Sequence, residues 1–448
     1  MRPLVRVRQP AGYAPEREYA VRVVLEEFLG LDVALETESR GDVELAVPDD
    51  SGRRVLLADG LFRTPPERWL TADSLPAVRR WDASESPARD ALVSPSLPVL
   101  FGEPEVEAGD GLIRVGLDVF GSAFFLLTRY EELCLPERDE HGRFPLTASI
   151  CGRAGIVDRP LVNEYVELLW WALSSLWPRL ERRPRTFRVV PSHDVDWPLN
   201  PDSRLAAVAA DLVKRRDPAL ALGRLVRRER LNDVFDLIMD ESERLGLRSA
   251  FYFIAGPTGR SVDGSCDLDH PFVRALLRRV DGRGHEIGLH PSYETFRDPE
   301  LTRQELDRLR AACEREGVAQ QVSGGRQHFL RWENPVTWRN WEEAGLEYDS
   351  TLSFREEPGF RCGVCYEYPV FDLRARRQLR LRERPLVVME VSALGDDPRR
   401  DAEGLERIRT LRDRCRRYRG DFTLLWHNNW LVSRRQQQLY RAALGADG

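Results

Sequence analysis

The chain has 448 residues, more than one hydrophobic core usually holds, so its length predicts two domains. Hydrophobic residues make up 42% and charged residues 31%, which is typical of a globular protein. The net charge of −6, with no basic tract interleaved with aromatic residues, argues against nucleic acid as a partner. No run approaches the roughly 18–20 apolar residues of a membrane span, so no such span is predicted.

The N-terminus and the cysteines bear on cellular location. Residues 1–8 lack the apolar segment of a secretion signal, and the seven cysteines are odd in number and mostly scattered. We therefore expect a reduced, cytoplasmic protein. Only Cys362 and Cys365 are closely spaced, and no second pair is present to complete a zinc ribbon. A structural or redox role for this pair is left open.

The first 185 residues mix predicted helices with short strands, as in a smaller α/β or α+β domain. Helices are predicted over 19–29, 117–132 and 161–176, and strands over 43–47, 54–57 and 97–101. The apolar helix over 117–132 is expected to be buried and to emerge with Arg129, Glu131 and Glu132 in its last turns. A polar stretch with a proline at 181–185 predicts a boundary between domains 1–185 and 186–448.

The second part of the chain alternates between strands and helices. Strands are predicted over 186–193, 249–255, 285–290, 320–329, 346–353, 385–392 and 421–427, and helices over 203–215, 230–245, 270–282, 299–316, 335–344, 402–418 and 433–444. This alternation predicts a parallel sheet, in a doubly wound fold or a barrel. In both architectures the chemistry belongs at the C-terminal ends of the strands.

The first of these strands runs into the sequence Ser-His-Asp-Val-Asp at 192–196. Side chains two residues apart on a strand point to the same side, so Asp194 and Asp196 are expected next to each other at the edge of the sheet. Their charges repel unless a cation or a shared proton relieves them. The pair therefore suits a metal site in which one carboxylate binds the ion and the other takes a proton from water. A solvated turn is the alternative.

Further polar residues stand at the ends of the other predicted strands. They are His290, Arg326, His328, Asp349 and His427. Five of the seven histidines of the chain, at 193, 285, 290, 328 and 427, lie in or beside these strands. Any one of them alone is more often a structural histidine than a ligand, but their repeated position indicates an active site at this edge.

Residues 186–430 resemble the polysaccharide deacetylase superfamily, carbohydrate esterase family 4, on five motifs in the family's order. The counterparts are His-Asp-Val-Asp at 193–196, Gly-His-Glu-Ile-Gly-Leu-His at 284–290, Arg-Gln-His-Phe at 326–329, Tyr-Asp-Ser-Thr at 348–351 and Leu-Leu-Trp-His at 424–427. The resemblance implies a distorted, incomplete (β/α) barrel. It also implies a metal-dependent hydrolase that removes N-acetyl groups from a sugar or glycan intermediate.

The resemblance implies catalytic roles for four matched residues. Asp194 would be the base, oriented by Arg326, and His427, oriented by Asp349, would protonate the leaving group. His285 is expected to be structural. Tryptophans that lie close in sequence to these positions would either face a sugar ring or belong to the core; they are Trp197, Trp332, Trp426 and Trp430.

The metal ligands depart from the family's pattern at one position. The resemblance implies Asp196 and His290 as ligands of a divalent ion, with zinc expected first and cobalt or manganese as alternatives. Four residues after His290, where the family has a second histidine, this chain has Glu294. The third ligand is expected to be Glu294 or His328, with His328 favoured because imidazole suits these metals. A weak or inactive site is the remaining reading.

The N-terminal part resembles an uncharacterised domain that precedes deacetylase-like modules. The runs over 120–132 and 141–145 carry this resemblance. It implies no activity of its own.

Other functions are left open for the second part. One is hydrolysis of O-acetyl esters or deacetylation of a lipid- or nucleotide-linked sugar. Another is a non-catalytic scaffold that binds a carbohydrate or a partner through a degenerate metal site. A phosphoesterase would need more basic groups near the site than the sequence reveals.

Overall fold

The computed structural model describes residues 4–49, 52–198, 208–209, 212–213, 218, 221–222, 233–256, 262–395 and 397–445. The helix predicted over 203–215 lies mostly outside these residues. Within them, no helix is both long and apolar enough to cross a membrane. All seven cysteines are free, and Cys362 and Cys365 are buried.

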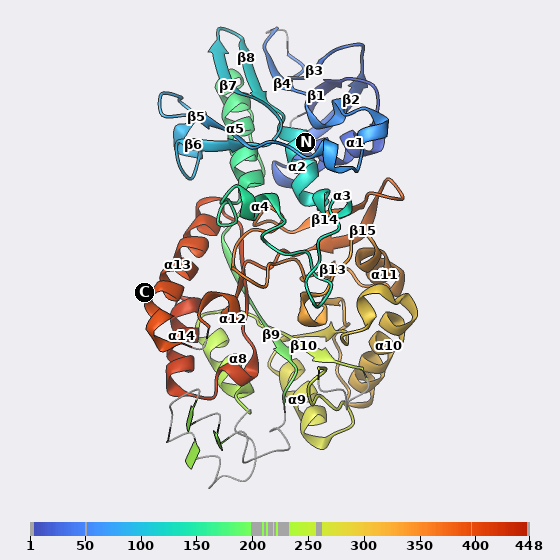
Figure 1. Cartoon of the computed structure of the whole chain (residues 1–448), viewed down its shortest axis with the longest axis vertical. Coiled ribbons are helices and arrows are strands. Elements are labelled where there is room, and N and C mark those ends of the chain that lie inside the picture. Colours follow the sequence, from blue (N-terminus) through green and yellow to red (C-terminus); the bar gives the residue numbers. More distant parts are fainter. Residues whose placement is uncertain are drawn as a thin grey trace.

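The N-terminal half is built on a six-stranded mixed sheet at one end of the long axis of the molecule (Figure 1). Its strands, in the order β2-β1-β3-β4-β8-β7, are β1 (Leu4–Gln9), β2 (Asp32–Thr37), β3 (Asp42–Ala46), β4 (Arg54–Ala58), β7 (Gly102–Gly109) and β8 (Leu112–Leu117). A separate antiparallel pair consists of β5 (Arg79–Asp82) and β6 (Ser96–Val99). The helices are α1 (Ala14–Arg22), α2 (Val119–Leu127), α3 (Glu131–Cys134), α4 (Ile150–Arg153) and α5 (Leu161–Leu176). This mixture agrees with the predicted α/β or α+β domain.

The second half is built on a nine-stranded sheet with the order β14-β15-β13-β12-β11-β10-β9-β17-β16. Its strands are β9 (Arg188–Val195), β10 (Ala250–Ile254), β11 (Glu286–His290), β12 (Gly324–Gly325), β13 (Tyr348–Asp349), β14 (Tyr368–Asp372), β15 (Arg377–Glu383), β16 (Val388–Met389) and β17 (Asp421–Leu425). The helices are α8 (Phe235–Arg244), α9 (Pro271–Gly282), α10 (Pro299–Arg315), α11 (Val336–Ala344), α12 (Glu390–Ala393), α13 (Asp401–Arg417) and α14 (Arg434–Leu444). All neighbouring strands are parallel except β14, which pairs antiparallel with β15.

The sequence of the central strands explains their position. All five residues of β10 and of β17 are buried, as expected for parallel strands that are covered on both faces. The two-residue strand β12 is made of glycines because its neighbours come too close for a side chain. A Cβ atom at Gly325 would lie 1.8 Å from the carbonyl oxygen of Leu289 on β11. The short strands therefore bring the residues that follow them close to those that follow β11.

The sheet curves but does not close through a ladder of hydrogen bonds in the described part of the chain. One backbone bond, from the Leu386 N–H to the Leu352 carbonyl (3.2 Å), links the segment before β16 to the segment after β13. No strand pairing joins β16 to β13 or to β14 among the described residues. The predicted α/β fold with a mainly parallel sheet is confirmed, whereas closure into a barrel is not shown.

The two halves share one hydrophobic core. A single cluster of buried residues runs from Val5 on β1 to Leu444 on α14. The Tyr19 hydroxyl donates to the Pro369 carbonyl (2.8 Å), and the Tyr368 hydroxyl donates to the Leu127 carbonyl (2.8 Å). The two sheets are formed by residues 4–117 and 188–425, which is compatible with a boundary at 181–185; that boundary stays a prediction.

Buried charges at this interface correct one expectation. The helix predicted over 117–132 breaks at Arg129, whose φ of 51° separates α2 from α3. Instead of emerging into solvent, Arg129, Glu131 and Glu132 are fully buried. Arg129 Nε contacts Glu132 Oε1 (2.8 Å), and Arg361 of the second half contacts Glu132 Oε2 (2.8 Å). An apolar run cannot reveal this network, because the partner of Glu132 lies more than 200 residues away in the sequence.

His193 on β9 is a buried structural residue, with its Nδ1 2.7 Å from the Trp426 carbonyl. Burial lowers its pKa to about 3, below the value of about 6.5 expected in the unfolded chain. Between these values the unfolded state binds a proton that the folded state does not. The contribution of His193 to the free energy of unfolding is therefore complete above pH 6.5 and falls as the pH drops toward 3.

We expect His193→Gln to reduce the slope of the free energy of unfolding against pH, below pH 6.5, by up to about 1.4 kcal/mol per pH unit. Urea unfolding of both proteins from pH 7 to pH 4 measures the difference in slope. Other titrating groups are present in both proteins, so the difference isolates His193. Parallel profiles would contradict the assignment.

Candidate active site

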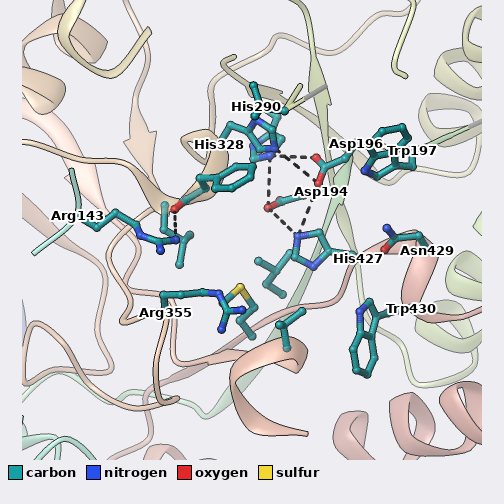
Figure 2. A pocket seen from close by; sticks show the side chains of 16 residues that line it. Arg143, Asp194, Asp196, Trp197, His290, His328, Arg355, His427, Asn429 and Trp430 are labelled. Atoms are coloured by element: carbon teal, nitrogen blue, oxygen red, sulfur yellow. Dashed lines mark hydrogen bonds and ion pairs between the residues drawn. The ribbon is translucent and has the colours of Figure 1, made fainter. Parts of the chain in front are cut away.

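Polar side chains from four segments meet at the C-terminal edge of the second sheet (Figure 2). Their parallel strands end at the same edge, which is why residues far apart in sequence converge there. Asp194 and Asp196 come from the end of β9 and the residue after it, and His290 ends β11. Arg326 and His328 follow β12, and His427 follows β17. The structure thus brings six of the eight residues predicted for the site together.

Asp194 is fixed by Arg326, which is fully buried. Arg326 Nη1 lies 2.8 Å from Asp194 Oδ1, its Nη2 donates to Ser192 Oγ (2.9 Å), and its Nε donates to the Ser350 carbonyl (2.9 Å). The other carboxylate oxygen, Asp194 Oδ2, lies 3.7 Å from His290 Nε2 and 4.0 Å from His427 Nε2. One oxygen is therefore tied down and the other faces the two histidines.

Asp196, His290 and His328 form the group in the described chain that fits a metal ion, with one ligand atom from each lying within 4.8 Å of the others. His290 Nε2 is 3.2 Å from Asp196 Oδ1, and His328 Nε2 is 3.9 Å from Asp196 Oδ2. Two ligands of one zinc ion lie no more than about 4.2 Å apart, since each is about 2.1 Å from it. Both Asp196 Oδ1 and His290 Nε2 are buried without a hydrogen-bond partner among the described residues. These unsatisfied atoms fit a bound cation.

The charge on Asp196 is favoured by its surroundings. Burial raises the pKa of Asp196, but the imidazoles of His290, His328 and His427 outweigh burial and hold the pKa below its ordinary value. The carboxylate is therefore ionised at neutral pH and able to serve as a ligand.

The ring nitrogens that face away from this group have partners that orient both histidines. His290 Nδ1 lies 2.6 Å from the Arg326 carbonyl, and His328 Nδ1 lies 3.1 Å from Asp263 Oδ1. Such partners fix the ring so that Nε2 faces the metal position. Asp263 is next to Gly264, which has a φ of 74° and no room for a Cβ atom because the Asp196 carbonyl would lie 2.1 Å away. No motif or spacing in the sequence pointed to Asp263.

We expect Asp263→Asn to weaken divalent metal binding by about 10- to 100-fold, because it removes the charge that orients His328. Competition with a chromophoric chelator measures the affinity. Asp269→Asn is the matched control, since this exposed aspartate contacts Arg315 instead. Equal affinities for both variants would show that Asp263 does not support the site.

Glu390, at the start of α12, orients His427. Its Oε1 lies 2.6 Å from His427 Nδ1, and its side chain is fully buried. Burial lowers the pKa of His427, but the charges of Glu390, Asp196 and Asp194 outweigh burial and raise the pKa to about 10. Glu390 therefore favours the protonated form of His427, and the Nε2 atom of His427 faces Asp194 and Asp196. No sequence signal indicated Glu390, which fell inside the strand predicted over 385–392.

Asp349 does not lie against His427, contrary to the expectation that it orients this residue. Its Oδ1 accepts hydrogen bonds from the Thr351 N–H (3.0 Å) and the Thr351 hydroxyl, while Oδ2 has no partner in the described chain. Burial raises the pKa of Asp349 to about 7. Asp349 ends β13, and its bonds to Thr351 support the loop that follows this strand.

Glu294 is also not brought to the site. Its side chain is 55% exposed and its Oε2 lies 3.7 Å from Arg331 Nη1. The reason is local: after β11 the chain turns at Pro291, and Glu294 precedes a 3₁₀ turn that begins at Thr295. Of the two alternatives for a third ligand, the geometry favours His328.

The site opens into a cavity of about 350 Å³. Its lining residues are Arg143, Asp194, Asp196, Trp197, Val262, His290, His328, Phe329, Leu330, Arg355, Met389, Val391, Leu425, His427, Asn429 and Trp430. Trp197 and Trp430 are half-buried and line it, whereas Trp332 and Trp426 are fully buried in the core. Two of the four tryptophans thus face the cavity and two belong to the core.

Residues 5–178 match the model of a family of unknown function, DUF7033. No curated protein matches the chain. Three solved structures are similar to it at low identity. They are a candidate polysaccharide deacetylase from Mycobacterium smegmatis (17% identity, TM-score 0.39, 59% of this chain and 85% of that one), the PuuE allantoinase (12%, 0.36, 60% and 88%) and the Xyl-CE4 domain of a multidomain xylanase from the hindgut metagenome of Trinervitermes trinervoides (10%, 0.28, 59% and 83%).

Proposed function

We propose that the chain is a metal-dependent hydrolase that removes acetyl groups from the nitrogen of an N-acetylated sugar or glycan intermediate. The observation that carries this proposal is the position of Asp194 Oδ2 between His290 Nε2 and His427 Nε2, beside the Asp196, His290 and His328 group. Hydrolysis of an amide requires a base, an acid and a metal that activates water. Here the candidate base lies 4.0 Å from the candidate acid and 3.7 Å from His290 of the metal-binding group.

The two oxygen atoms of Asp194 have different tasks. Oδ1 receives the Arg326 guanidinium, which fixes the carboxylate plane. Oδ2 takes a proton from the water whose oxygen forms the new bond to the acetyl carbon. Arg326 acts through Asp194 and is a positioning residue rather than a catalytic one.

His427 completes the reaction at the leaving group. When the carbon–nitrogen bond breaks, Nε2 donates its proton to the amine nitrogen, and Glu390 stabilises the proton that stays on Nδ1. An amine leaves poorly without such a proton, whereas the alcohol of an ester leaves more easily. A general acid at the position of His427 therefore suits an N-acetyl substrate, whose amine needs a proton in order to leave. The products are acetate and a free amino sugar.

The residues present fit a divalent ion. Asp196, His290 and His328 would hold it through one oxygen and two nitrogen atoms, a donor set that suits zinc, with cobalt or manganese as alternatives. Bound there, such an ion supplies a Lewis acid for the attacking water and the acetyl oxygen.

The test is release of acetate from N-acetylglucosamine oligosaccharides and from O-acetylated sugars, by the chain supplied with Zn, Co or Mn. We expect release from an N-acetyl substrate that chelator abolishes and added metal restores. Release from esters alone would make the protein an O-acetyl esterase. No release from any substrate, with the protein folded and loaded with metal, would leave the scaffold function instead.

A further inference from the structure

Arg355 carries a charge without a counterion at the edge of the cavity. It is exposed, it lines the cavity, and it makes no hydrogen bond or ion pair with any described residue. The acidic residues beside it are turned elsewhere. Glu356 Oε1 accepts from the Leu146 N–H (3.0 Å), and Glu357 lies 3.5 Å from Arg407.

A second arginine reaches the cavity from the N-terminal half. Arg143 is mostly buried, with its Nη2 2.7 Å from Asp139 Oδ2 and its Nη1 donating to the Phe329 carbonyl (3.1 Å). Its Nε also contacts Asp139, so three of the five N–H groups of the guanidinium are used. Two N–H groups remain, on a side chain whose position is fixed.

The loop that carries Arg143 is fastened to the second half next to the site. His141 Nδ1 lies 2.9 Å from the Tyr293 hydroxyl, and Arg331 Nε donates to the His141 carbonyl (2.8 Å). Leu146 contacts Glu356, the neighbour of Arg355. The N-terminal half thus forms one wall of the cavity.

The arrangement of the lining has two sides. Figure 2 shows Arg143 and Arg355 on one side, Trp197, Asn429 and Trp430 on the other, and Asp194 and His427 between them. The carboxylates that line the described cavity are Asp194 and Asp196. Asp194 is tied to Arg326 and Asp196 lies with the histidines, so neither neutralises Arg355.

We propose that the substrate carries, besides its acetamido group, an anionic group that Arg355 and Arg143 bind. Phosphate and carboxylate share the required chemistry, because the planar guanidinium of arginine pairs with either. This inference rests on the proposed function for the reacting group and adds the substrate class. It also gives the N-terminal half a role in specificity, through Arg143.

The test compares kcat/KM for acetate release from neutral and anionic substrates. The neutral substrate is N-acetylglucosamine, and the anionic ones are its 1-phosphate, its 6-phosphate and N-acetylmuramic acid, which carries a carboxylate. We expect kcat/KM for at least one anionic sugar to exceed kcat/KM for the neutral sugar by about 10- to 100-fold. Arg355→Met should bring the ratio of these two kcat/KM values close to one. Arg355→Lys should restore part of the preference for the anionic sugar. The matched control Arg380→Met, 88% exposed on β15, should leave the ratio unchanged.

The outcomes separate this inference from the proposed function. If a neutral sugar is hydrolysed as well as every anionic one, or if Arg355→Met keeps the ratio, the anion site is refuted while the hydrolase stands. If no sugar releases acetate, calorimetry of the same sugars decides. Binding of a phosphate or carboxylate sugar that Arg355→Met weakens at least tenfold supports the anion site alone, and equal binding to both proteins refutes it. The preferred sugar shows whether the group is a phosphate or a carboxylate.

Discussion

Asp194→Asn is expected to lower kcat for acetate release by about 10²- to 10⁴-fold, the range that general base catalysis contributes. An amide at this position can still accept the hydrogen bond of Arg326 through its oxygen, but it cannot take a proton from water. Because Asp194 is not one of the three proposed ligands, the metal content should stay close to that of the wild type. Steady-state kinetics and metal analysis of the same samples measure kcat and metal content.

The control for this variant is Asp307→Asn, an exposed aspartate on α10 whose side chain is 59% accessible. It should leave kcat unchanged. If Asp194→Asn retains more than a tenth of wild-type kcat with its metal content intact, Asp194 is not the base. Another residue would then have to take the proton from the attacking water.

His328→Ala is expected to lower zinc affinity by more than about 100-fold, since removal of a ligand should cost at least as much as removal of a residue that only orients one. Glu294→Ala should leave the affinity unchanged, because Glu294 is half-exposed and lies near Arg331. Competition with a chromophoric chelator gives both values. The reverse result, a loss with Glu294→Ala and none with His328→Ala, would show that the carboxylate moves into the site when metal binds.

Much of the site could be predicted because its residues follow strands. Alternation along β9 places Asp194 and Asp196 together and turns His193 to the other face, where it packs against Tyr440 of α14. The end of β11 places His290 by the same rule. The sheet fixes the position of a residue at the end of a buried parallel strand. The two-residue alternation and the order of the strands along the chain are therefore sufficient to predict such a residue as part of the site.

Residues outside strands could not be predicted in this way. Asp263 lies in a loop whose position depends on Gly264 packing against Asp196, a contact that leaves no local pattern. Glu390 occupies the first turn of α12, directly after the two-residue strand β16. Its contact with His427 depends on how that short strand pairs with β17. Asp263 and Glu390 are both acidic partners of a histidine. The histidines in the motifs imply that such partners exist, but they do not indicate where in the sequence the partners lie.

The fold was predictable to a similar degree. The parallel strands β10 and β17 are buried along their whole length, lie between helices and were located within a few residues. The hairpin of β14 and β15 was missed, because β15 has only two apolar residues, Leu379 and Leu381, and because the hairpin adds an edge to the sheet rather than continuing the alternation with helices. The route by which 139–146 reaches the site is set by contacts between the two halves, which no local pattern encodes.

The account depends on one cation shared by Asp196, His290 and His328. The most direct test is a crystal structure of the zinc-loaded protein, with anomalous diffraction recorded on both sides of the zinc absorption edge. We expect one strong peak per chain, about 2.0–2.2 Å from a carboxylate oxygen of Asp196 and from Nε2 of both histidines. Zinc-saturated crystals with no peak among these three side chains would contradict the proposed hydrolase.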